Sequence, residues 1–383
     1  MKTGLTVLIA GGGIGGLTLG VALRRAGIAF KIFERAPALL RVGAGISMQS
    51  NAMLAFRTLG VDTAVAAAGQ EIQGGAILNP RGEEISSMPV SKASAEVGAP
   101  MITIHRGRLQ DVLHQIVGDD NLVLGAKVEG FRDGPDGLFV RLADGREFQG
   151  DLLVGADGLR SAVRAQLLKE PSPRYSGYTS WRGVCDVSEG VRRDYTSESW
   201  GPGMRFGVVP IGEGQTYWFA TATAPEGGVD HPDARTELLQ RFSGWHAPIP
   251  QLIENTPSSA IMRTDIHDRV PIRQWVQGRA VLLGDAAHPM TPNMGQGGCQ
   301  AVEDAVVLAR CLSLEAELPA ALARYQAVRV ERANDFVAGS YRIGQIGQWE
   351  NAFACWVREK LMRMMSSDRV DARTRRNLQF TPL

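Results

Sequence analysis

Apolar and polar positions follow one another most regularly in the first thirty-five residues. Residues 7–9 are a short apolar run typical of a buried strand, and residues 14–26 form a longer run of helical length. Gly27 follows at the place where a helix commonly ends. Residues 30–33 are apolar again and lead to Glu34. The pattern predicts a strand–turn–helix–strand unit with an acidic residue at its tip.

The next part of the chain predicts a mixture of helices and short strands. Residues 72–90 have strand-like alternation, and residues 103–117 have the spacing of an amphipathic helix led in by one or two strand residues. Three short strands are expected between residues 123 and 154, the last of them at 147–154. The stretch 91–100 contains Ser, Gly and Pro and is expected to form a loop.

From about residue 175 the pattern changes to alternating runs that are rich in aromatic residues. Residues 204–211 and 215–223 predict strands of an antiparallel sheet, and residues 231–245 predict a surface helix. After residue 279 the chain returns to a buried strand, a long helix at about 297–312 and further helices to about 365. The basic tail beyond is expected to be loosely ordered. This order predicts an α/β fold with an inserted antiparallel domain.

Composition excludes several classes of function. The 383 residues carry 41 basic and 40 acidic side chains, so the net charge of +1 gives no footprint for nucleic acid or an anionic membrane. The four cysteines lie far apart, which favours neither a metal site nor disulfides and fits a reducing cytoplasm. No apolar run has the length of a membrane span. The apolar start is interpreted as core because its glycines have motif spacing.

The turn after the first strand carries the spacing G-x-G-x-x-G, with Gly11, Gly13 and Gly16. Gly11 allows a tight turn, Gly13 lets a pyrophosphate approach the backbone, and Gly16 lets the helix pack closely on the strand. The helix N-terminus directs free N–H groups toward the phosphates. Glu34 can accept hydrogen bonds from both hydroxyls of an adenosine ribose. A bare glycine-rich turn would not require the flanking strand, helix and acid, so dinucleotide binding is predicted.

Two later stretches place further polar residues at the ends of buried strands. In residues 150–164 a strand runs into Asp157 and Gly158 and then into a helix. In residues 278–309 a strand ends at Asp285, and a loop rich in Pro and Gly leads into the next helix. Asp285 can accept a hydrogen bond from a polyol hydroxyl. The N–H groups of residues 295–298 can stabilise negative charge on an electron-rich ring.

These three motifs, in their order and spacing, resemble those of the FAD-dependent aromatic hydroxylases, the class A flavoprotein monooxygenases with the p-hydroxybenzoate hydroxylase fold. The resemblance covers residues 7 to about 361 and is greatest for the branch that contains urate, salicylate and hydroxynicotinate hydroxylases and zeaxanthin epoxidase. It implies a Rossmann-like FAD-binding domain of the GR2 type, an inserted antiparallel substrate domain and C-terminal helices. The expected FAD-binding domain spans 1–72, 97–170 and 264–340, the substrate domain 73–96 and 171–263, and the helical segment 341–383.

The resemblance also implies a set of residues that bind FAD. The expected contacts lie along the whole cofactor, from the ADP end to the flavin ring. They are Gly11, Gly13, Gly15, Gly16, Glu34, Arg35, Ser47, Arg106, Val128, Asp157, Asp285, Pro292, Gly295, Gly297 and Gly298. Without the framework of the family, Ser47, Val128 and Asp157 would be interpreted as ordinary turn, core and capping residues.

The activity implied by the resemblance is hydroxylation of a small aromatic or heteroaromatic compound through a flavin C4a-hydroperoxide, with O2 and NADH or NADPH. The nicotinamide cofactor is expected to bind transiently at the surface, and neither a metal nor a catalytic triad is expected. Epoxidation of an alkene or polyene, and a non-catalytic FAD-stabilised protein, remain open. A halogenase is disfavoured because the chain lacks W-x-W-x-I-P. A monomer and a homodimer are both compatible with the sequence.

Arg205 and Tyr217 are the residues expected to act on the substrate. They lie on neighbouring predicted strands and resemble positions that face the ring in the urate hydroxylase branch. Arg205 could bind an enolate, phenolate or carboxylate and Tyr217 could donate a hydrogen bond, although a salt bridge and a core aromatic are the plain alternatives. Asn293 stands where urate enzymes carry aspartate, which argues against urate. Trp181 is interpreted as core.

Overall fold

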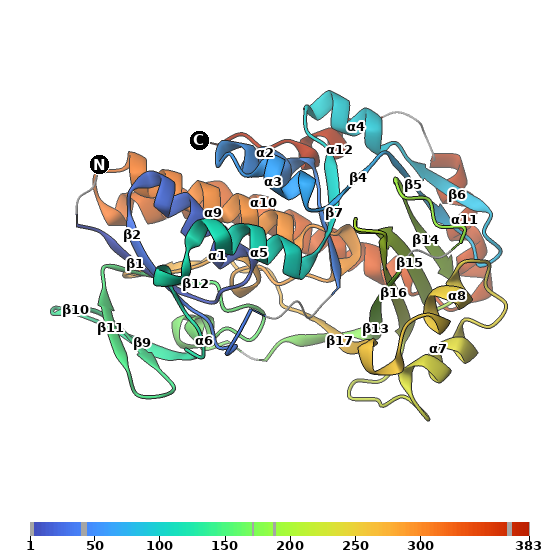
Figure 1. The fold of residues 1–383 in the computed structure, drawn as a ribbon, viewed down its shortest axis with the longest axis horizontal. Coiled ribbons are helices and arrows are strands. Elements are labelled where there is room, and N and C mark those ends of the chain that lie inside the picture. The colour runs from blue at the N-terminus through green and yellow to red at the C-terminus, as the bar shows by residue number, and fades with distance from the viewer. Residues whose placement is uncertain (1–3, 40–43, 171, 187–188, 366–369, 383) are drawn as a thin grey trace.

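The computed structural model describes residues 4–39, 44–170, 172–186, 189–365 and 370–382. Figure 1 shows two lobes side by side, each built on its own sheet, with two long helices running along the first of them. We call them the parallel-sheet lobe and the antiparallel-sheet lobe. The chain passes from one to the other several times, because the strands of each sheet come from separate segments.

The parallel-sheet lobe is built on six strands in the order β18-β19-β12-β1-β2-β8. Their bounds are β1 Thr6–Ala10, β2 Ala29–Phe33, β8 Leu122–Val123, β12 Leu152–Gly155, β18 Val276–Gln277 and β19 Ala280–Leu282. All neighbours are parallel except β18 and β19. Helices α1 (Ile14–Ala26), α5 (Arg106–Val117) and α9 (Gly297–Leu314) pack beside one another. The predicted strand–helix–strand unit at the N-terminus is therefore confirmed.

Two small sheets and several helices complete this lobe. One sheet joins β9 (Val128–Gly134), β10 (Gly137–Leu142) and β11 (Glu147–Gly150), and the other joins β3 (Gly45–Met48), β7 (Met101–His105) and β4 (Gln70–Ile72). Helices α2 (Ser50–Thr58), α3 (Asp62–Ala67) and α6 (Ala162–Leu168) pack against them, and α10 (Leu318–Gly347) packs against α9. The single strand predicted at 147–154 is wrong, because β11 and β12 belong to different sheets and Asp151 separates them. The Asp151 carboxylate accepts the N–H of Thr6 at 2.7 Å.

The antiparallel-sheet lobe is built on seven strands in the order β17-β13-β16-β15-β14-β5-β6. Their bounds are β5 Gly74–Leu78, β6 Glu84–Met88, β13 Arg174–Asp186, β14 Tyr195–Gly201, β15 Met204–Pro210, β16 Gln215–Thr223 and β17 Met262–Asp268. Only β14 and β5 are parallel neighbours. Strands β5 and β6, from residues 74–88, thus share a sheet with the later strands, while the expected boundary at 263 falls inside β17.

The two faces of the seven-stranded sheet have different neighbours. Trp181, Phe206 and Trp218 lie on one face, in a buried apolar cluster that includes residues of α7 (Ala234–Arg241) and α8 (Ile249–Glu254). The other face meets the parallel-sheet lobe, where Tyr217 packs with Ala44 just before β3. Trp181 is 1% exposed and belongs to the core face, as its interpretation as core predicted.

Two segments expected to be irregular are helical. Residues 90–97 form α4 (Val90–Val97), which Gly98 ends in a left-handed conformation with φ of 81°. The Ala, Lys and Glu side chains of this stretch favour a helix, and they outweigh its Ser residues. The tail contains α12 (Ala372–Leu378), which packs against α4 and is joined to it by an ion pair between Arg375 and Glu96 at 2.7 Å.

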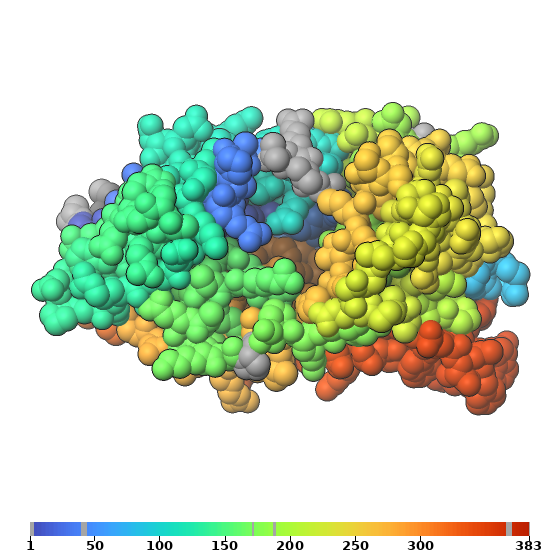
Figure 2. All heavy atoms as spheres, turned by 90° about the horizontal axis from the view of Figure 1, so that it is seen from below, coloured from blue at the N-terminus to red at the C-terminus, as the bar shows by residue number. Residues whose placement is uncertain are grey.

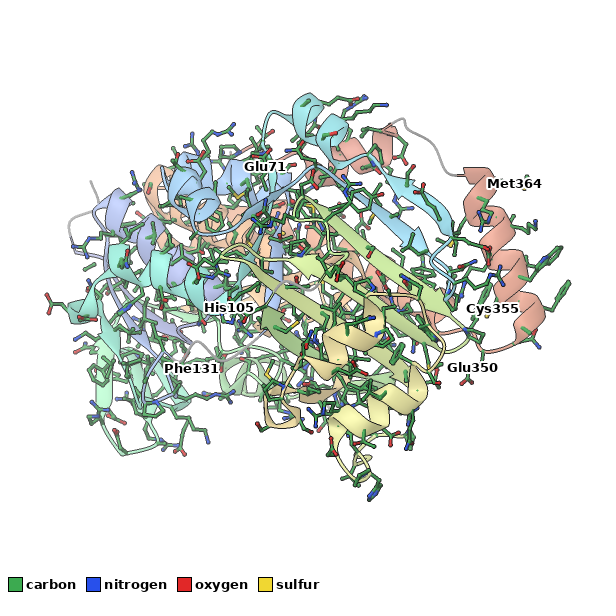
Figure 3. The ribbon with its side chains drawn as sticks, turned by 45° about the vertical axis from the view of Figure 1, so that its right-hand side comes forward. Glu71, His105, Phe131, Glu350, Cys355 and Met364 are labelled. Atoms are coloured by element: carbon green, nitrogen blue, oxygen red, sulfur yellow. The ribbon has the colours of Figure 1, made fainter. Side chains whose placement is uncertain are left out.

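Helix α11 (Ala352–Met365) lies at the rim of the antiparallel-sheet lobe and packs against β6. Figure 3 shows Cys355 and Met364 on this helix, well away from His105 at the start of α5. Phe353, Trp356 and Met364 are more than half exposed. Within the ranges given above, none of the helices combines the length and the hydropathy that crossing a bilayer requires.

Candidate active site

The glycine turn between β1 and α1 has the three properties that its spacing predicts. Gly11 has a φ of 107°, and a Cβ atom there would lie 2.4 Å from the carbonyl oxygen of Ala156. A Cβ atom on Gly16 would lie 2.0 Å from the carbonyl oxygen of Gly11, so helix and turn are in direct backbone contact. A Cβ atom on Gly13 would meet no atom within 4 Å. The turn is therefore closed on the protein side and open at Gly13, the residue before the helix.

Glu34 closes this end of the site. Its carboxylate accepts the N–H of Gly12 at 2.8 Å and the N–H of Ala36 at 2.8 Å, one on each oxygen. Each carboxylate oxygen can accept more than one hydrogen bond, so both keep capacity for ribose hydroxyls. The backbone bonds hold the side chain beside the open turn, in the orientation that a vicinal diol requires.

The other residues expected at the ADP end lie around this turn. Gly15 faces α9, and a Cβ atom there would lie 2.7 Å from a methyl group of Leu283. Arg35 is exposed next to Glu34. Val128 is 7% exposed at the start of β9, two residues beyond the N–H of Ala126, which donates to the backbone oxygen of Glu34. These positions fit a nucleotide with its phosphates at the helix.

The side chain of Asp157 binds the start of helix α6, which follows it in the chain. Its carboxylate accepts the N–H of Ala162 at 2.7 Å and the hydroxyl of Ser161, and it caps α6. Burial raises the pKa of this carboxyl, and the hydrogen bond from Ser161 opposes that effect. In the same helix, Arg164 donates to the carbonyl oxygens of Ala286 and Ala287 at 3.0 and 2.8 Å. The motif around Asp157 thus supports the loop after Asp285, and a direct contact of Asp157 with a cofactor stays a prediction.

Asp285 marks the other end of the site. The residue is exposed to solvent although protein atoms surround its carboxyl so closely that burial raises the pKa, against the charges of His288 and Arg106. A side chain that is both enclosed and accessible lines a cavity. Figure 2 shows such a hollow between the two lobes, with atoms of the N-terminal segment in blue and of the α9 region in orange at its floor. Arg106, the exposed first residue of α5, lies near the same carboxylate.

The loop that follows Asp285 brings the start of α9 to this hollow. Pro292 and Gly295 are exposed, and a Cβ atom on Gly297 would lie 3.8 Å from the Asp285 carboxylate. A Cβ atom on Gly298 would lie 2.7 Å from Ile46, which places β3 and its residue Ser47 directly over the first turn of the helix. The free N–H groups and the dipole of an 18-residue helix create a positive field at this point.

The geometry fits one extended dinucleotide. The open turn at Gly13 and the acid at Glu34 suit the ADP half, and Asp285 and the start of α9 suit a polyol and an electron-rich ring. All lie in the lobe whose parallel strands end toward the hollow, which is where ligands bind in such sheets. In the described part of the chain, no group of three or more His, Cys, Asp or Glu side chains could hold a metal ion.

Behind the start of α9 lies a buried network of charges that the sequence did not reveal. Arg329 of α10 is 1% exposed and pairs with Glu303 and with Asp304, the latter at 2.7 Å. Arg332 adds a second pair to Glu303 at 2.7 Å. The His288 ring forms a hydrogen bond with Asp304 at 2.6 Å, so this histidine belongs to the buried network. The network fixes α9 on α10 directly behind the place where the flavin ring is expected.

Arg205 is held entirely by protein groups. It is 2% exposed, and it donates to Glu198 at 3.0 Å, to Gln348 at 3.0 Å and to the side-chain oxygen of Asn293 at 2.6 Å. Tyr178 also donates to that oxygen, at 3.2 Å. Glu198 supplies the carboxylate that Asn293 lacks. A substrate contact of Arg205 stays a prediction, and the network shows that this residue positions the loop that carries Asn293.

Tyr217 lies nearer to the presumed ring site. Its side chain is 9% exposed and packs so closely on β3 that a Cβ atom on Gly45 would lie 2.7 Å from it. None of the described residues forms a hydrogen bond with its hydroxyl group. Burial raises the pKa of the phenol, and the charge of Arg182 opposes that effect. The hydroxyl is therefore a neutral donor available to a ligand.

The register of the sheet separates the two residues that were expected to act together. Arg205 pairs with Thr221, whereas Tyr217 pairs with Val209, four residues further along β15. The two side chains share a face but lie about 13 Å apart along the strands. Glu198 and Gln348, which bind Arg205, were not anticipated, because their contacts depend on this register and on the end of α10.

Comparison with known proteins agrees with this site. A family model described as “FAD binding domain” matches residues 4–340. The FAD-dependent urate hydroxylase of Klebsiella pneumoniae is 34% identical over 337 residues, which are 87% of this chain and 88% of the relative. Zeaxanthin epoxidase of Nicotiana plumbaginifolia, a chloroplastic protein, is 37% identical over 334 residues, which are 82% of this chain but 50% of the relative.

A solved structure extends the likeness to nearly every residue. The crystal structure of Klebsiella pneumoniae HpxO complexed with FAD and uric acid superposes with a TM-score of 0.92 at 30% identity, over 99% of this chain and 97% of the other. The sequence similarity, the family model and the fold all agree with the cofactor site built above from single residues. This chain is a member of the class A FAD-dependent monooxygenases, a family of FAD-binding hydroxylases that use NADH or NADPH.

Proposed function

We propose that this enzyme hydroxylates a small aromatic or heteroaromatic compound with O2 and NADH or NADPH. The observation that carries the proposal is the meeting of three elements at one place. The first turn of α9, strand β3 and the sheet face with Tyr217 surround the end of the cofactor hollow. A flat ring fits between such surfaces, and the phenol of Tyr217, which has no partner among the described residues, offers it a hydrogen bond.

Each part of the site has a distinct task in this proposal. FAD, when bound, supplies the redox chemistry that activates O2 with electrons from the nicotinamide. Glu34 and Asp285 hold its two polyol groups, and the first N–H groups of α9 stabilise negative charge at the ring. Val184 and Val209, beside Tyr217, exclude water from the substrate. Tyr217 donates to an oxygen of the substrate and so orients the carbon that is hydroxylated.

The identity of the substrate is part of the proposal. We expect a phenol, pyridine, purine or quinolone rather than urate. Urate is bound by the Klebsiella structure that this fold matches, but Arg205 here has an amide, Asn293, and not an aspartate as its partner in the loop. The carboxylate that Arg205 does bind, Glu198, comes from the neighbouring strand and is tied to the sheet.

Epoxidation is the second candidate because zeaxanthin epoxidase is a relative at 37% identity. A long polyene needs an open apolar channel without obligatory polar partners. The phenol of Tyr217, without a partner among the described residues, favours a compact ring with oxygen or nitrogen atoms close to the reacting carbon over a long polyene. Hydroxylation is therefore preferred.

The decisive experiment measures consumption of NADH and NADPH by the FAD-loaded enzyme in the presence of each compound class. We expect one class to stimulate consumption strongly and to yield a product with one added oxygen atom. Peroxide release, measured in parallel, separates productive turnover from uncoupled oxidation. Tyr217→Phe should raise the peroxide fraction, whereas Tyr195→Phe, at the start of β14, should not.

Two results would contradict the proposal. An oxygenated polyene in the absence of any aromatic product would establish epoxidation. A protein that binds FAD but consumes no NADH or NADPH with any compound, polyenes included, would support a non-catalytic role.

A further inference from the structure

The sheet face that meets the cofactor hollow carries side chains in three successive rows. Each row takes one residue from β13, β16 and β15, which are hydrogen-bonded neighbours. The rows are Val184–Tyr217–Val209, then Arg182–Phe219–Gly207, then Ser180–Thr221–Arg205. Two arginines thus point to the same face, one in the last row and one in the middle row.

The two arginines differ in what surrounds them. Arg205 is 2% exposed and has Glu198, Gln348 and Asn293 as partners, so its charge is already compensated. Arg182 is only partly buried, and no described residue forms a hydrogen bond or an ion pair with it. A guanidinium that has lost part of its hydration and has no partner among the described residues favours an anionic ligand.

The middle row leaves space beside Arg182. A Cβ atom on Gly207 would lie 2.0 Å from the ring of Phe219. The ring of Phe219 therefore leans over β15, away from β13 and its partly buried residue Arg182. Phe219 itself is partly exposed and supplies an aromatic wall to that space.

Arg182 is also connected to the cofactor end of the hollow. Its charge acts on the phenol of Tyr217, which packs against Gly45 of β3. The backbone oxygen of Ala44, the residue before Gly45, accepts the N–H of Arg106. Arg106 in turn lies near the carboxylate of Asp285. A ligand between Arg182 and the first turn of α9 would thus contact Tyr217 as well.

We infer that Arg182 is the anion-binding residue of the substrate site and that the substrate carries a carboxylate or an ionised ring oxygen. The inference rests on the proposed function and deepens it. The planar guanidinium can bind a carboxylate through two parallel hydrogen bonds. Phe219 stacks on the ring, Tyr217 binds a second oxygen, and Arg205 keeps the loop with Asn293 in place.

The test uses the FAD-loaded enzyme and pairs of probes that differ only in charge. Benzoate, nicotinate and quinoline-2-carboxylate are compared with their carboxamides, and binding is followed by the change in the flavin absorbance spectrum. We expect at least one carboxylate to bind the native enzyme more tightly than its amide. Arg182→Gln should weaken the binding of that carboxylate about 10- to 100-fold and the binding of the amide less than about 3-fold.

Control variants separate this role from a general loss of charge or of folding. Arg241→Gln removes the same charge from α7 on the opposite face of the sheet, where Arg241 pairs with Glu237 at 2.7 Å and lies over the ring of Trp181, and should change neither affinity. Arg182→Lys should keep part of the preference for the carboxylate. FAD content and melting temperature should be unchanged in all three variants.

Several outcomes would overturn the inference. These are equal weakening of acid and amide by Arg182→Gln, an equal effect of Arg241→Gln, or no preference for any carboxylate in the native enzyme. A rise in KM for NADH or NADPH without a change in probe binding would instead assign Arg182 to a phosphate of the nicotinamide cofactor. The proposed function would fail separately if a ligand bound with the expected charge preference while no compound stimulated NADH or NADPH consumption.

Discussion

Gly13 and Gly16 belong to one turn, yet the space around their Cα atoms differs completely. A side-chain carbon on Gly16 would overlap the backbone of Gly11, whereas one on Gly13 would meet only the space where a phosphate is expected. Gly13 has a φ of −73°, which any residue can adopt. One glycine is therefore required by the protein and the other by the ligand.

This contrast gives a matched pair of substitutions. Gly13→Ala should leave the melting temperature of the FAD-free protein within about 2 °C and weaken FAD binding by about 10-fold or more, because the methyl group occupies the approach to the pyrophosphate. Gly16→Ala should destabilise the FAD-free protein itself by about 2 kcal/mol or more, because backbone atoms must move. Thermal unfolding and fluorescence titration with FAD measure both. Identical behaviour of the two variants would contradict the assignment.

At the same scale, the sequence revealed the residues whose role is local and missed those whose role is tertiary. Glu34 and Asp285 could be predicted because each comes within three residues of the end of a buried strand. Glu198 and Gln348 could not, since they meet Arg205 only through strand register and the end of a long helix. Arg182 alternates with core residues in its strand, and the pattern alone gives it no distinction from a surface residue.

Among the elements, helices α9 and α10 are joined by deeply buried ion pairs. The pairs of Arg329 with Glu303 and Asp304 lie where side-chain exposure is 1% or less. Removing one partner of a buried pair leaves a charge without compensation, which costs far more than the pair contributes. The start of α9, where the ring of FAD is expected, depends on this anchorage.

Arg329→Met should therefore lower the free energy of unfolding by about 3–5 kcal/mol, since two carboxylates lose their buried partner. Arg324→Gln is the control, because its pair with Glu315 is partly exposed, at 41% and 28%, and should cost less than about 1 kcal/mol. Denaturant unfolding at neutral pH measures both. Equal effects would show that burial of the network is unimportant.

The same network sets the response to acid. Burial alone would raise the pKa of the Asp304 carboxyl, but the charges of His288 and Arg329 lower it to about 2. A depressed pKa stabilises the fold above the unfolded value of about 4, and the contribution is lost as the pH falls from there toward 2. We expect a loss of about 2 kcal/mol over this range, measured by denaturant unfolding. Asp304→Asn should flatten this part of the profile, and an unchanged slope would contradict the assignment.

Elements were predictable where one pattern dominated and not where two elements adjoined. Helix α1 matches its expected bounds because an apolar run, a glycine stop and a preceding turn agree. Strands β11 and β12 were merged because only Asp151 divides them, and a single residue leaves no trace in the alternation. Helix α4 was missed because its Ser residues and the following Gly-Ala-Pro suggested a loop, although α12 packs on it.

For the whole molecule, the cofactor is the bridge between the lobes. Its ADP half is expected in the parallel-sheet lobe and its ring where β3 and Tyr217 bring the other lobe close. A ligand that binds only the folded state stabilises it, by about 2.7 kcal/mol at a concentration 100-fold above its Kd. FAD should therefore stabilise the contact between the lobes as well as its own turn.

Removal of FAD should lower the melting temperature by several degrees, and addition of FAD at about 100-fold above its Kd should restore it. ADP, compared at the same multiple of its own Kd, should raise the stability of the parallel-sheet lobe while leaving the protease sensitivity of the antiparallel-sheet lobe unchanged. FAD should protect both lobes. Protection of both by ADP alone would contradict the bridging role.

The division of the six-stranded sheet among distant segments has a consequence for how the enzyme is made. Strand β1 pairs with β12, and β12 pairs with β19, so the cradle of the cofactor joins residues near positions 10, 155 and 282. At about 5–20 residues per second, a ribosome needs roughly 15–50 s to advance from Glu34 to Gly298. The nucleotide turn is thus synthesised long before α9, the helix that completes the ring site. We therefore expect FAD to bind late in synthesis. A nascent chain that is halted before α9 should bind no FAD and should lack the yellow colour of the flavin.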